Sequence, residues 1–411
     1  MYLSLKLAEG PETLKPRLGL KRRNMMKKLF TIFIFFGFIA SVFAETSQTL
    51  PAGRFRARVK PIYAFSFNTQ FDQSGLEKSL VNKFEKKADS ALVRKISNDL
   101  ANLMESPVGV ASLGEFLPSL NISSLVLGGA IEYGITNDLT VGAIVPVISA
   151  QSKFDLKFNP DPNALASSRP EIRGAAKNML QSVQDYASSK GYAPFENWDA
   201  IGLGDIELGV KYRLLNTELW TIATKSGVRL PTGRVDNIDH LTDVAFGDGQ
   251  TDLGTTLLID FKEIPNVLVN GMIKYTAQLP DREILRVPDE GELFTSKKEN
   301  LKRDLGDRID TALYVEYPFL QAFNVNATYT FFAKQKDQFT SALGYNASGL
   351  EKSTNQYKYS IDTGLGFSSL PWFKAGTFSL PMEAGLNFEL PLWGKNVAKA
   401  TTAYLEYKLY F

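Results

Sequence analysis

The 411-residue chain has no cysteine, a single histidine and almost no net charge, with 46 Lys+Arg against 44 Asp+Glu. The absence of cysteine excludes disulfide bonds, iron–sulfur clusters and thiol nucleophiles. The balanced charge argues against a protein that binds nucleic acid through a basic surface, so no nucleic-acid partner is expected. With 44% apolar and only 22% charged residues, the composition also excludes a disordered chain.

The N-terminal region has the features of a signal peptide for Sec export. Lys27 and Lys28 precede an apolar run over 29–40, and Val42-Phe43-Ala44 gives the Val-x-Ala pattern of a cleavage site. The run is short for a membrane-spanning helix, and an uncleaved anchor is the alternative. We therefore expect residues 1–44 to be removed.

The start of the chain is unusual, because residues 1–24 make a long region before the basic pair. Met25 and Met26 stand directly before that pair. The true start of translation is therefore expected at one of these two methionines. The remaining chain, 45–411, is expected to form one domain.

After this region, no stretch contains the roughly 18 apolar residues that a membrane-spanning helix needs. Apolar and polar residues instead alternate, a period of two that indicates strands with one apolar face. Within 55–67, Phe55 and Ala57 share one parity, while Arg56 and Arg58 share the other. The same alternation returns at 123–135, 139–149, 203–215, 219–231, 252–262, 267–277, 307–319, 323–332, 357–368, 377–390 and 401–411. The pattern predicts about twelve strands, with fourteen as the alternative count, each near the roughly 9–11 residues that cross a bilayer.

The connections between these segments alternate in length. The short ones are 136–138, 216–218, 263–266, 320–322 and 369–376. Short turns on one side and long loops on the other are typical of outer-membrane barrels. The amphipathic final segment ends at Phe411 and resembles the signal that the outer-membrane insertion machinery reads. We expect an all-β, antiparallel transmembrane barrel in the bacterial outer membrane, with its lipids and this machinery as partners and a soluble β-sandwich as the alternative.

Charged residues recur on the parity that would face the interior of the barrel. An acidic residue recurs on the inward parity in segments such as Ile131-Glu132-Tyr133-Gly134 and Ile206-Glu207-Leu208-Gly209. Basic residues occupy the same parity on the intervening strands. If a turn is centred on Thr217, Asp205 lies opposite Arg229 as a cross-strand ion pair. The residues expected to line the lumen are Arg54, Arg56, Arg58, Glu132, Asp205, Glu207, Lys211, Lys225, Arg229, Asp252, Lys274, Asp310, Asp362 and Glu406. They would set the size and field of a pore, or, in the alternative, fill a closed lumen.

Two of the long connections are predicted to be helical. Residues 75–105 place Leu80, Phe84 and Leu92 among apolar residues at steps of four, which indicates an amphipathic helix. A second helix is expected over 171–189, after a proline. These insertions would cover the mouth of the barrel, and Leu80, Phe84 and Leu92 are candidates for a lid. A surface covering without this role and a site for partner docking are the alternatives.

Several motifs carry a family resemblance. They are Gly202-Leu203-Gly204-Asp205-Ile206-Glu207-Leu208-Gly209-Val210-Lys211-Tyr212-Arg213, Gly227-Val228-Arg229-Leu230-Pro231-Thr232-Gly233 and Phe246-Gly247-Asp248-Gly249-Gln250-Thr251-Asp252. Roughly residues 120–275 thereby resemble an outer-membrane family associated with the meta-pathway of phenol degradation. The resemblance implies a transport-type barrel linked to uptake of aromatic or other hydrophobic small molecules. The two helical insertions depart from the compact pattern of that family.

No catalytic or metal-binding motif stands out. The only histidine, His240, falls in an expected loop between Asp239 and Asp243, where a solvated side chain is the favoured interpretation. Phe246-Gly247-Asp248 begins a Gly/Asp turn without the full spacing of an EF-hand calcium loop. We therefore expect no enzyme, no cofactor and no metal. The sequence favours an outer-membrane channel for small solutes, hydrophobic or aromatic compounds among them, with a structural or surface-interaction barrel as the alternative.

Overall fold

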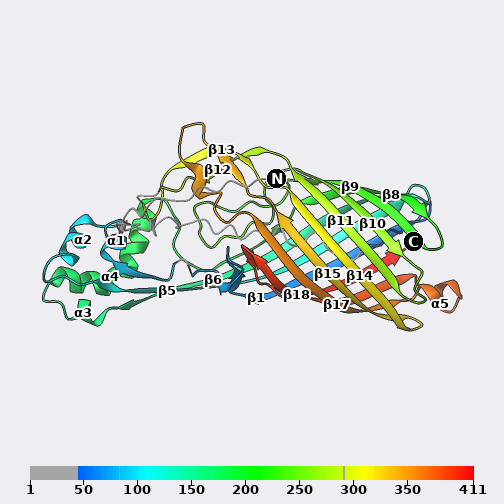
Figure 1. Cartoon of the computed structure of the whole chain (residues 1–411), viewed down its shortest axis with the longest axis horizontal. Coiled ribbons are helices and arrows are strands. Elements are labelled where there is room, and N and C mark those ends of the chain that lie inside the picture. Colours follow the sequence, from blue (N-terminus) through cyan, green and yellow to red (C-terminus); the bar gives the residue numbers. More distant parts are fainter. Residues whose placement is uncertain (1–44, 83, 290–291) are drawn as a thin grey trace, which may run out of the picture.

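The computed structural model describes residues 45–411 except residue 83 and residues 290–291, so the expected leader over 1–44 lies outside the described residues. Strands with one apolar and one polar face are stable in a bilayer only when their edges close on one another. Twelve strands close into a barrel in this way (Figure 1). The wall consists of β1 (Phe55–Phe67), β5 (Ser112–Gly134), β6 (Leu139–Pro160), β8 (Ile206–Asn216), β9 (Trp220–Leu230), β10 (Asp252–Phe261), β11 (Leu268–Gln278), β14 (Arg308–Leu320), β15 (Phe323–Lys334), β17 (Gln356–Ser368), β18 (Met382–Lys395) and β20 (Thr402–Tyr410).

Each wall strand pairs antiparallel with the next wall strand in sequence, and β1 closes the ring by pairing with both β5 and β20. On β1, for example, Arg56 lies opposite Glu132 of β5 and Tyr410 of β20. The predicted antiparallel barrel of about twelve strands is confirmed. Two more strands, β4 (Lys86–Asp89) and β7 (Trp198–Leu203), pair only with parts of β5 and β6 beyond those bonded to β1 and β8. They lie outside the ring, so the alternative of fourteen wall strands is wrong.

The outer surface of the wall is apolar. On β10, Leu253 and Leu257 are exposed, whereas Asp252 and Thr256, which directly precede them, are buried inside. Water solvates such a continuous apolar surface poorly, and lipid chains solvate it well. The strand alternation predicted from the sequence therefore separates a lipid-facing surface from a polar interior.

Short turns join the strands at one end of the barrel, as expected, and α5 (Leu370–Lys374) lies in one of them. At the loop end, small sheets form from β2 (Thr69–Phe71), β3 (Glu77–Ser79) and β19 (Val397–Ala398), and from β12 (Asp281–Arg286), β13 (Lys298–Asp304) and β16 (Gln338–Thr340), with a turn of 3-10 helix at η1 (Ala347–Gly349). These sheets lie outside the ring and order the long loops.

Strands β5 and β6 continue far beyond the wall. They contain 23 and 22 residues, about twice what a bilayer crossing needs, whereas the sequence predicted only 123–135 and 139–149. Their outer parts, 112–121 and 153–160, pair with each other as a ribbon that we call the stalk (Figure 1). Around its end lie α1 (Ser90–Val93), α2 (Asn98–Met104), α3 (Pro162–Leu165) and α4 (Pro170–Ser189), which we call the cap.

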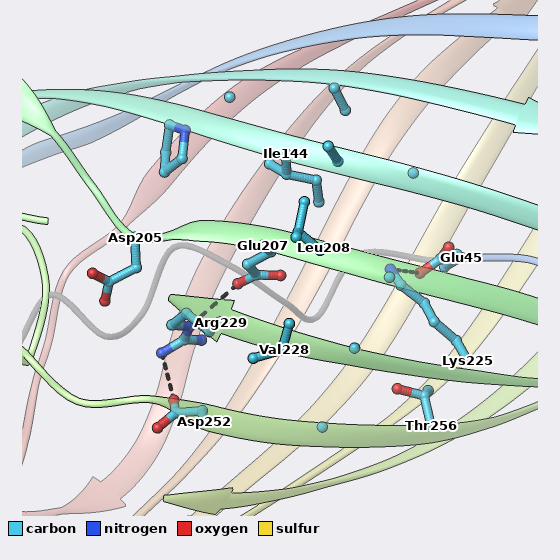
Figure 2. A pocket seen from close by; sticks show the side chains of 18 of the residues that line it. Glu45, Ile144, Asp205, Glu207, Leu208, Lys225, Val228, Arg229, Asp252 and Thr256 are labelled. Atoms are coloured by element: carbon cyan, nitrogen blue, oxygen red, sulfur yellow. Dashed lines mark hydrogen bonds and ion pairs between the residues drawn. The ribbon is translucent and has the colours of Figure 1, made fainter. Parts of the chain in front are cut away.

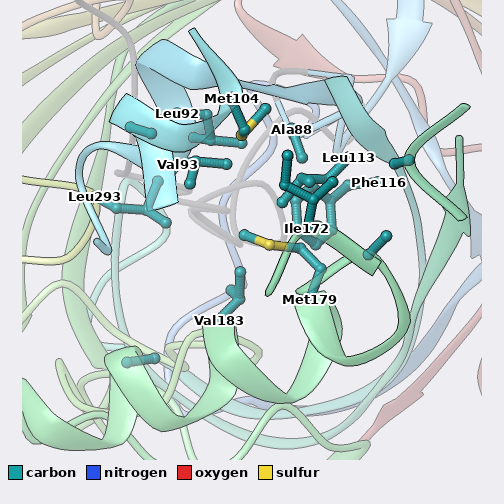
Figure 3. Close-up of a cluster of buried hydrophobic side chains, with 14 of the residues drawn as sticks. Ala88, Leu92, Val93, Met104, Leu113, Phe116, Ile172, Met179, Val183 and Leu293 are labelled. Carbon is teal, nitrogen blue, oxygen red and sulfur yellow. The ribbon is translucent and has the colours of Figure 1, made fainter. Parts of the chain in front are cut away.

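The cap has a hydrophobic core of its own. On α4, the buried side chains Ile172, Met179 and Val183 recur at helical spacing and point toward Leu92 on α1 and Met104 on α2 (Figure 3). The helix predicted over 171–189 is thus confirmed as α4. None of the helices in the described part of the chain is long and apolar enough to cross a membrane.

The single helix predicted over 75–105 is wrong. This segment forms β3, β4, α1 and α2 in turn, with Asp89 and Ser97 capping the two short helices through hydrogen bonds to backbone N–H groups. A spacing of four is also a multiple of two, so the same apolar residues suit strands as well as a helix. Leu80 and Leu92 are buried as the pattern required, but in separate clusters.

Candidate functional site

Inward side chains of β8, β9, β10 and β11 form rows across the wall. The row nearest the loops, here called the acidic row, contains Glu207, Arg229, Asp252 and Gln278 at paired positions. The next, here called the lysine row, contains Lys211, Lys225, Thr256 and Lys274. A third row near the turns contains Asn216, Thr221, Asp260 and Asn270. Rows of different charge therefore follow one another along the barrel axis.

A cavity of about 220 Å³ lies against the acidic row and the lysine row (Figure 2). Side chains from β1, β5 and β6 complete its lining, and apolar groups such as Ile62 and Ile148 lie beside charged ones. Such a lining can accommodate water and also contact an apolar solute.

Arg229 is the centre of the acidic row. Its guanidinium contacts the carboxylates of Glu207 at 3.4 Å and Asp252 at 3.1 Å (Figure 2). The predicted pairing of Arg229 with Asp205 is wrong. A register shift between Arg213 and Leu215 and the position of the turn move the pairing by two residues, so that Glu207 lies opposite Arg229.

Asp205 instead contacts the loop that joins β9 to β10. The backbone N–H of Gly233 donates a hydrogen bond of 2.8 Å to Asp205 Oδ1. A Cβ atom at Gly247 would lie only 2.4 Å from the same oxygen, so the close approach of the loop requires glycine there. This explains two glycines of the motifs noted above: they bring the 231–251 loop down onto the entrance of the lumen.

The segment before β1, residues 45–53, runs inside the turn half of the barrel, and we call it the inner segment. The carboxylate of Glu45 lies 2.9 Å from the ammonium groups of both Lys211 and Lys225. The backbone N–H of Ser47 donates to both carboxylate oxygens of Asp260, at 3.0 and 3.1 Å. The inner segment therefore occupies the lumen beside the lysine row and neutralises part of its charge.

Charges on the remaining wall are also paired. Arg56 contacts Glu132, Arg58 lies 3.7 Å from Glu406, and Lys358 lies 2.7 Å from Glu389. Such pairing compensates much of the cost of burying charges inside a narrow barrel. Two of these residues, Arg58 and Glu132, also line the cavity.

A hairpin of β12 and β13 reaches the mouth. Arg303 contacts Asp281 at 2.6 Å and also Glu283, and it donates to the backbone oxygen of Asp248 in the 231–251 loop. One guanidinium thus joins the hairpin to the loop that lies over the lumen.

Glu283 makes this junction sensitive to pH. Burial raises the pKa of Glu283 from 4.5 to about 7; Asp236 and Asp281 add to the rise, while Arg303 opposes it. Because the folded pKa exceeds the unfolded one, this group stabilises the hairpin fully below the unfolded pKa and loses that contribution as pH rises through about 7.

We expect hydrogen-exchange protection of β12 and β13 to fall between about pH 5 and about pH 8. Glu283→Gln should flatten that profile, and an identical profile in the variant would contradict the assignment.

The structure places the predicted lumen residues in three groups. Lining the cavity are Arg58, Glu132, Asp205, Glu207, Lys211, Lys225, Arg229, Asp252 and Lys274. Arg56, Asp310, Asp362 and Glu406 are not among the residues that line the cavity, although Arg56 and Glu406 form ion pairs with two residues that do. Arg54 precedes β1, is exposed and is not among the residues that line the cavity.

Of the predicted lid residues, only Leu92 lies on a helix of the cap. Phe84 and Leu92 line a second cavity, and Leu80 is buried in a cluster with Phe67 and Ile122. Sequence reasoning missed Glu45, Thr256 and the Lys358–Glu389 pair. Parity along β10 could have indicated Thr256. Nothing in the sequence indicates that Glu45 folds back into the barrel.

His240 lies in the 231–251 loop but is half-buried, which corrects the expectation of a solvated side chain. Its Nδ1 lies 3.1 Å from Thr242 Oγ1, and its Nε2 lies 3.8 Å from a carboxylate oxygen of Glu196. Among the described residues, no group of three or more potential ligands is arranged to hold a metal ion.

No protein-family model and no curated protein matches the chain, so the resemblance to the meta-pathway family stays a prediction. Among solved structures, an outer membrane channel from Pseudomonas putida F1 matches with a TM-score of 0.54 and 12% identity, over 90% of this chain and 100% of that chain. A mutant of the TodX monoaromatic hydrocarbon channel has a TM-score of 0.38 and 11% identity over 88% and 91% of the two chains. The Ralstonia pickettii toluene transporter TbuX has 0.35 and 10% over 88% and 90%. The likeness to the Pseudomonas putida structure shows that this chain has the fold of an outer-membrane barrel.

Proposed function

We propose that this protein is an outer-membrane channel for small solutes, with a preference for apolar or aromatic ones. The observation that carries the proposal is the cavity of about 220 Å³ inside a closed wall, lined by the charged rows and by apolar side chains. Pore diameter and rings of charged side chains determine what passes through a channel. The aromatic preference rests on the family resemblance and on the apolar part of the lining.

The proposal includes the path to the membrane. We infer Sec export through the leader, and recognition of the last strand by the outer-membrane insertion machinery. Phe411 is exposed, and its backbone exchanges hydrogen bonds of 3.0 and 3.3 Å with Phe55 at the seam of the ring. Outer-membrane lipids would then contact the apolar surface.

A structural or surface-interaction barrel with a filled lumen is the second candidate. The inner segment and the paired charges around Arg58 and Lys358 favour it, because they occupy part of the interior. The two candidates differ in one measurable property, which is whether ions and small solutes pass through the lumen of the barrel.

Single-channel recording in planar bilayers tests the proposal. We expect the wild-type protein to give discrete conductance events, and Thr256→Trp to reduce them because Thr256 faces the cavity between Lys225 and Lys274. Thr255→Trp is the matched control, since its side chain faces lipid one position away. Absence of events and of solute flux in liposomes for the wild type would reject the channel and leave the filled barrel.

A further inference from the structure

The second cavity lies in the cap region, outside the barrel lumen. Its volume is about 180 Å³, and side chains from the stalk, α1, α4 and the loops of the mouth line it. Six aromatic residues contribute to the lining: Phe84, Phe116, Phe154, Tyr192, Phe195 and Phe294. The cavity borders the hydrophobic core that α4 forms with α1 and α2 (Figure 3).

The aromatic rings on one side of the cavity form a connected set. The ring centroids of Phe195 and Phe294 lie 5.8 Å apart, those of Tyr192 and Phe294 lie 5.2 Å apart, and those of Phe154 and Phe195 lie 6.2 Å apart. Rings at such separations hold one another in tilted and edge-on arrangements. A flat aromatic ring entering the cavity would find further ring faces and edges to contact.

Several polar groups of the lining are already engaged within the protein. Arg286 donates to four backbone carbonyl oxygens and to Asp239. Asp243 accepts two hydrogen bonds from the guanidinium of Arg234, at 2.6 and 2.7 Å. Thr242 donates to the backbone oxygen of Glu196 at 3.0 Å. A ligand would therefore be recognised mainly by apolar contact.

The size of the cavity selects among apolar molecules. An apolar protein cavity of roughly 150 Å³ is enough to bind benzene, and the cap cavity is slightly larger. We propose that the cap cavity is a binding site for a neutral molecule with one aromatic ring. The site lies outside the lumen, so the inference goes beyond the proposed function and holds whether or not the barrel conducts.

The 231–251 loop separates this site from the lumen. Its residues 236–238 and 240–243 line the cap cavity, while residues 245–248 line the lumen cavity. Val244 lies between the two sets and is buried, together with Phe246, beside Trp198. A molecule in the cap cavity is thus one loop away from the lumen, in a place where it would collect before passing inward.

Binding of fluorobenzene to the purified, detergent-folded protein tests the site, with ¹⁹F NMR as the readout and protein-free micelles as the blank. We expect saturable binding by the wild type. Val183→Trp fills the cavity from α4, and Leu241→Trp fills it from the 231–251 loop. Each should weaken binding at least about tenfold, since filling removes the space that the ring occupies. Gln181→Trp, exposed on the same helix, is the matched control and should bind like the wild type.

Crystals of the wild type soaked in bromobenzene supply the second measurement. Bromine signal among Phe195, Phe294 and Val183 supports the site even if both filling variants fail to fold. No saturable binding beyond the micelle blank, unchanged binding in folded filling variants, or bromine only in the lumen would each overturn it. The lumen variant Thr256→Trp should retain fluorobenzene binding. Failure of the channel proposal, seen as missing conductance, is therefore distinguishable from failure of this one.

Discussion

Deleting residues 45–50 is expected to raise the single-channel conductance severalfold, by about three to ten times, because the deletion opens the part of the lumen that these residues occupy. These residues hold Glu45 against Lys211 and Lys225 and anchor Ser47 to Asp260 inside the lumen. Without Glu45, the lysine row loses its carboxylate partner, and the field at that level becomes positive. The conductance should therefore also shift toward anions, which reversal potentials in a salt gradient measure.

A replacement of residues 45–50 by a Gly/Ser sequence of equal length separates occupancy from specific contact. If the ion pairs hold the inner segment in place, the replacement should behave like the deletion. If volume alone matters, it should behave like the wild type. Glu45→Gln keeps the shape and removes the charge, and it should change ion preference more than conductance. A deletion variant with unchanged conductance and selectivity would contradict a plug at this position.

Arg286→Ala is expected to loosen the cap and the loops at the mouth while leaving the wall intact. Arg286 Nε and the two terminal nitrogens reach Ile238, Lys190, Gly191 and Thr295 through their backbone oxygens, at 2.6 to 3.0 Å. Its guanidinium also lies 3.8 Å from the centre of the Tyr192 ring. Removing it leaves these carbonyl groups without their donor, at a cost to local stability of about 3 to 5 kcal/mol.

Limited proteolysis and hydrogen exchange measure this loss. Cleavage near 190 and 238 should accelerate in Arg286→Ala, while the heat-modifiable migration of the folded barrel on gels should persist. Arg286→Lys keeps the charge without the planar fork and should restore only part of the protection. Arg282→Ala, exposed on the same strand, is the matched control and should resemble the wild type. Equal protection in Arg286→Ala and the control would show that the cap stands without this contact.

The wall could be predicted from the sequence because each of its positions obeys one local rule. A residue such as Leu253 faces lipid and the adjacent Asp252 faces inward, so the alternation of side chains reports the environment directly. Turn lengths then order the strands, and α4 follows from helical spacing. For the same reason, the parity of most candidate lumen residues agreed with the structure.

What the sequence could not specify depends on contacts between distant segments. The partner of Arg229 changed because the register shift near Leu215 is invisible to parity, and moving a pairing by two residues leaves every side chain on the same face. The sequence did not predict the stalk, because its apolar side chains pack against the cap and not against lipid. Residues 75–105 were assigned to a helix because steps of four suit both kinds of structure. The inner segment gave no periodic signal, since it is held by ion pairs and not by a sheet.

The seam between β1 and β20 has a consequence for the order of assembly. The first and last strands of the wall meet there, with Arg56 opposite Tyr410, so the ring stays open until the final residues of the chain are in place. The inner segment directly precedes β1 and binds side chains of β8, β9 and β10. Its binding surface lies on three strands that do not border the seam, so pairing of β8, β9 and β10 is enough to complete this surface in a wall that is still open. Whether the inner segment ends inside the lumen would then depend on whether it binds before the seam closes.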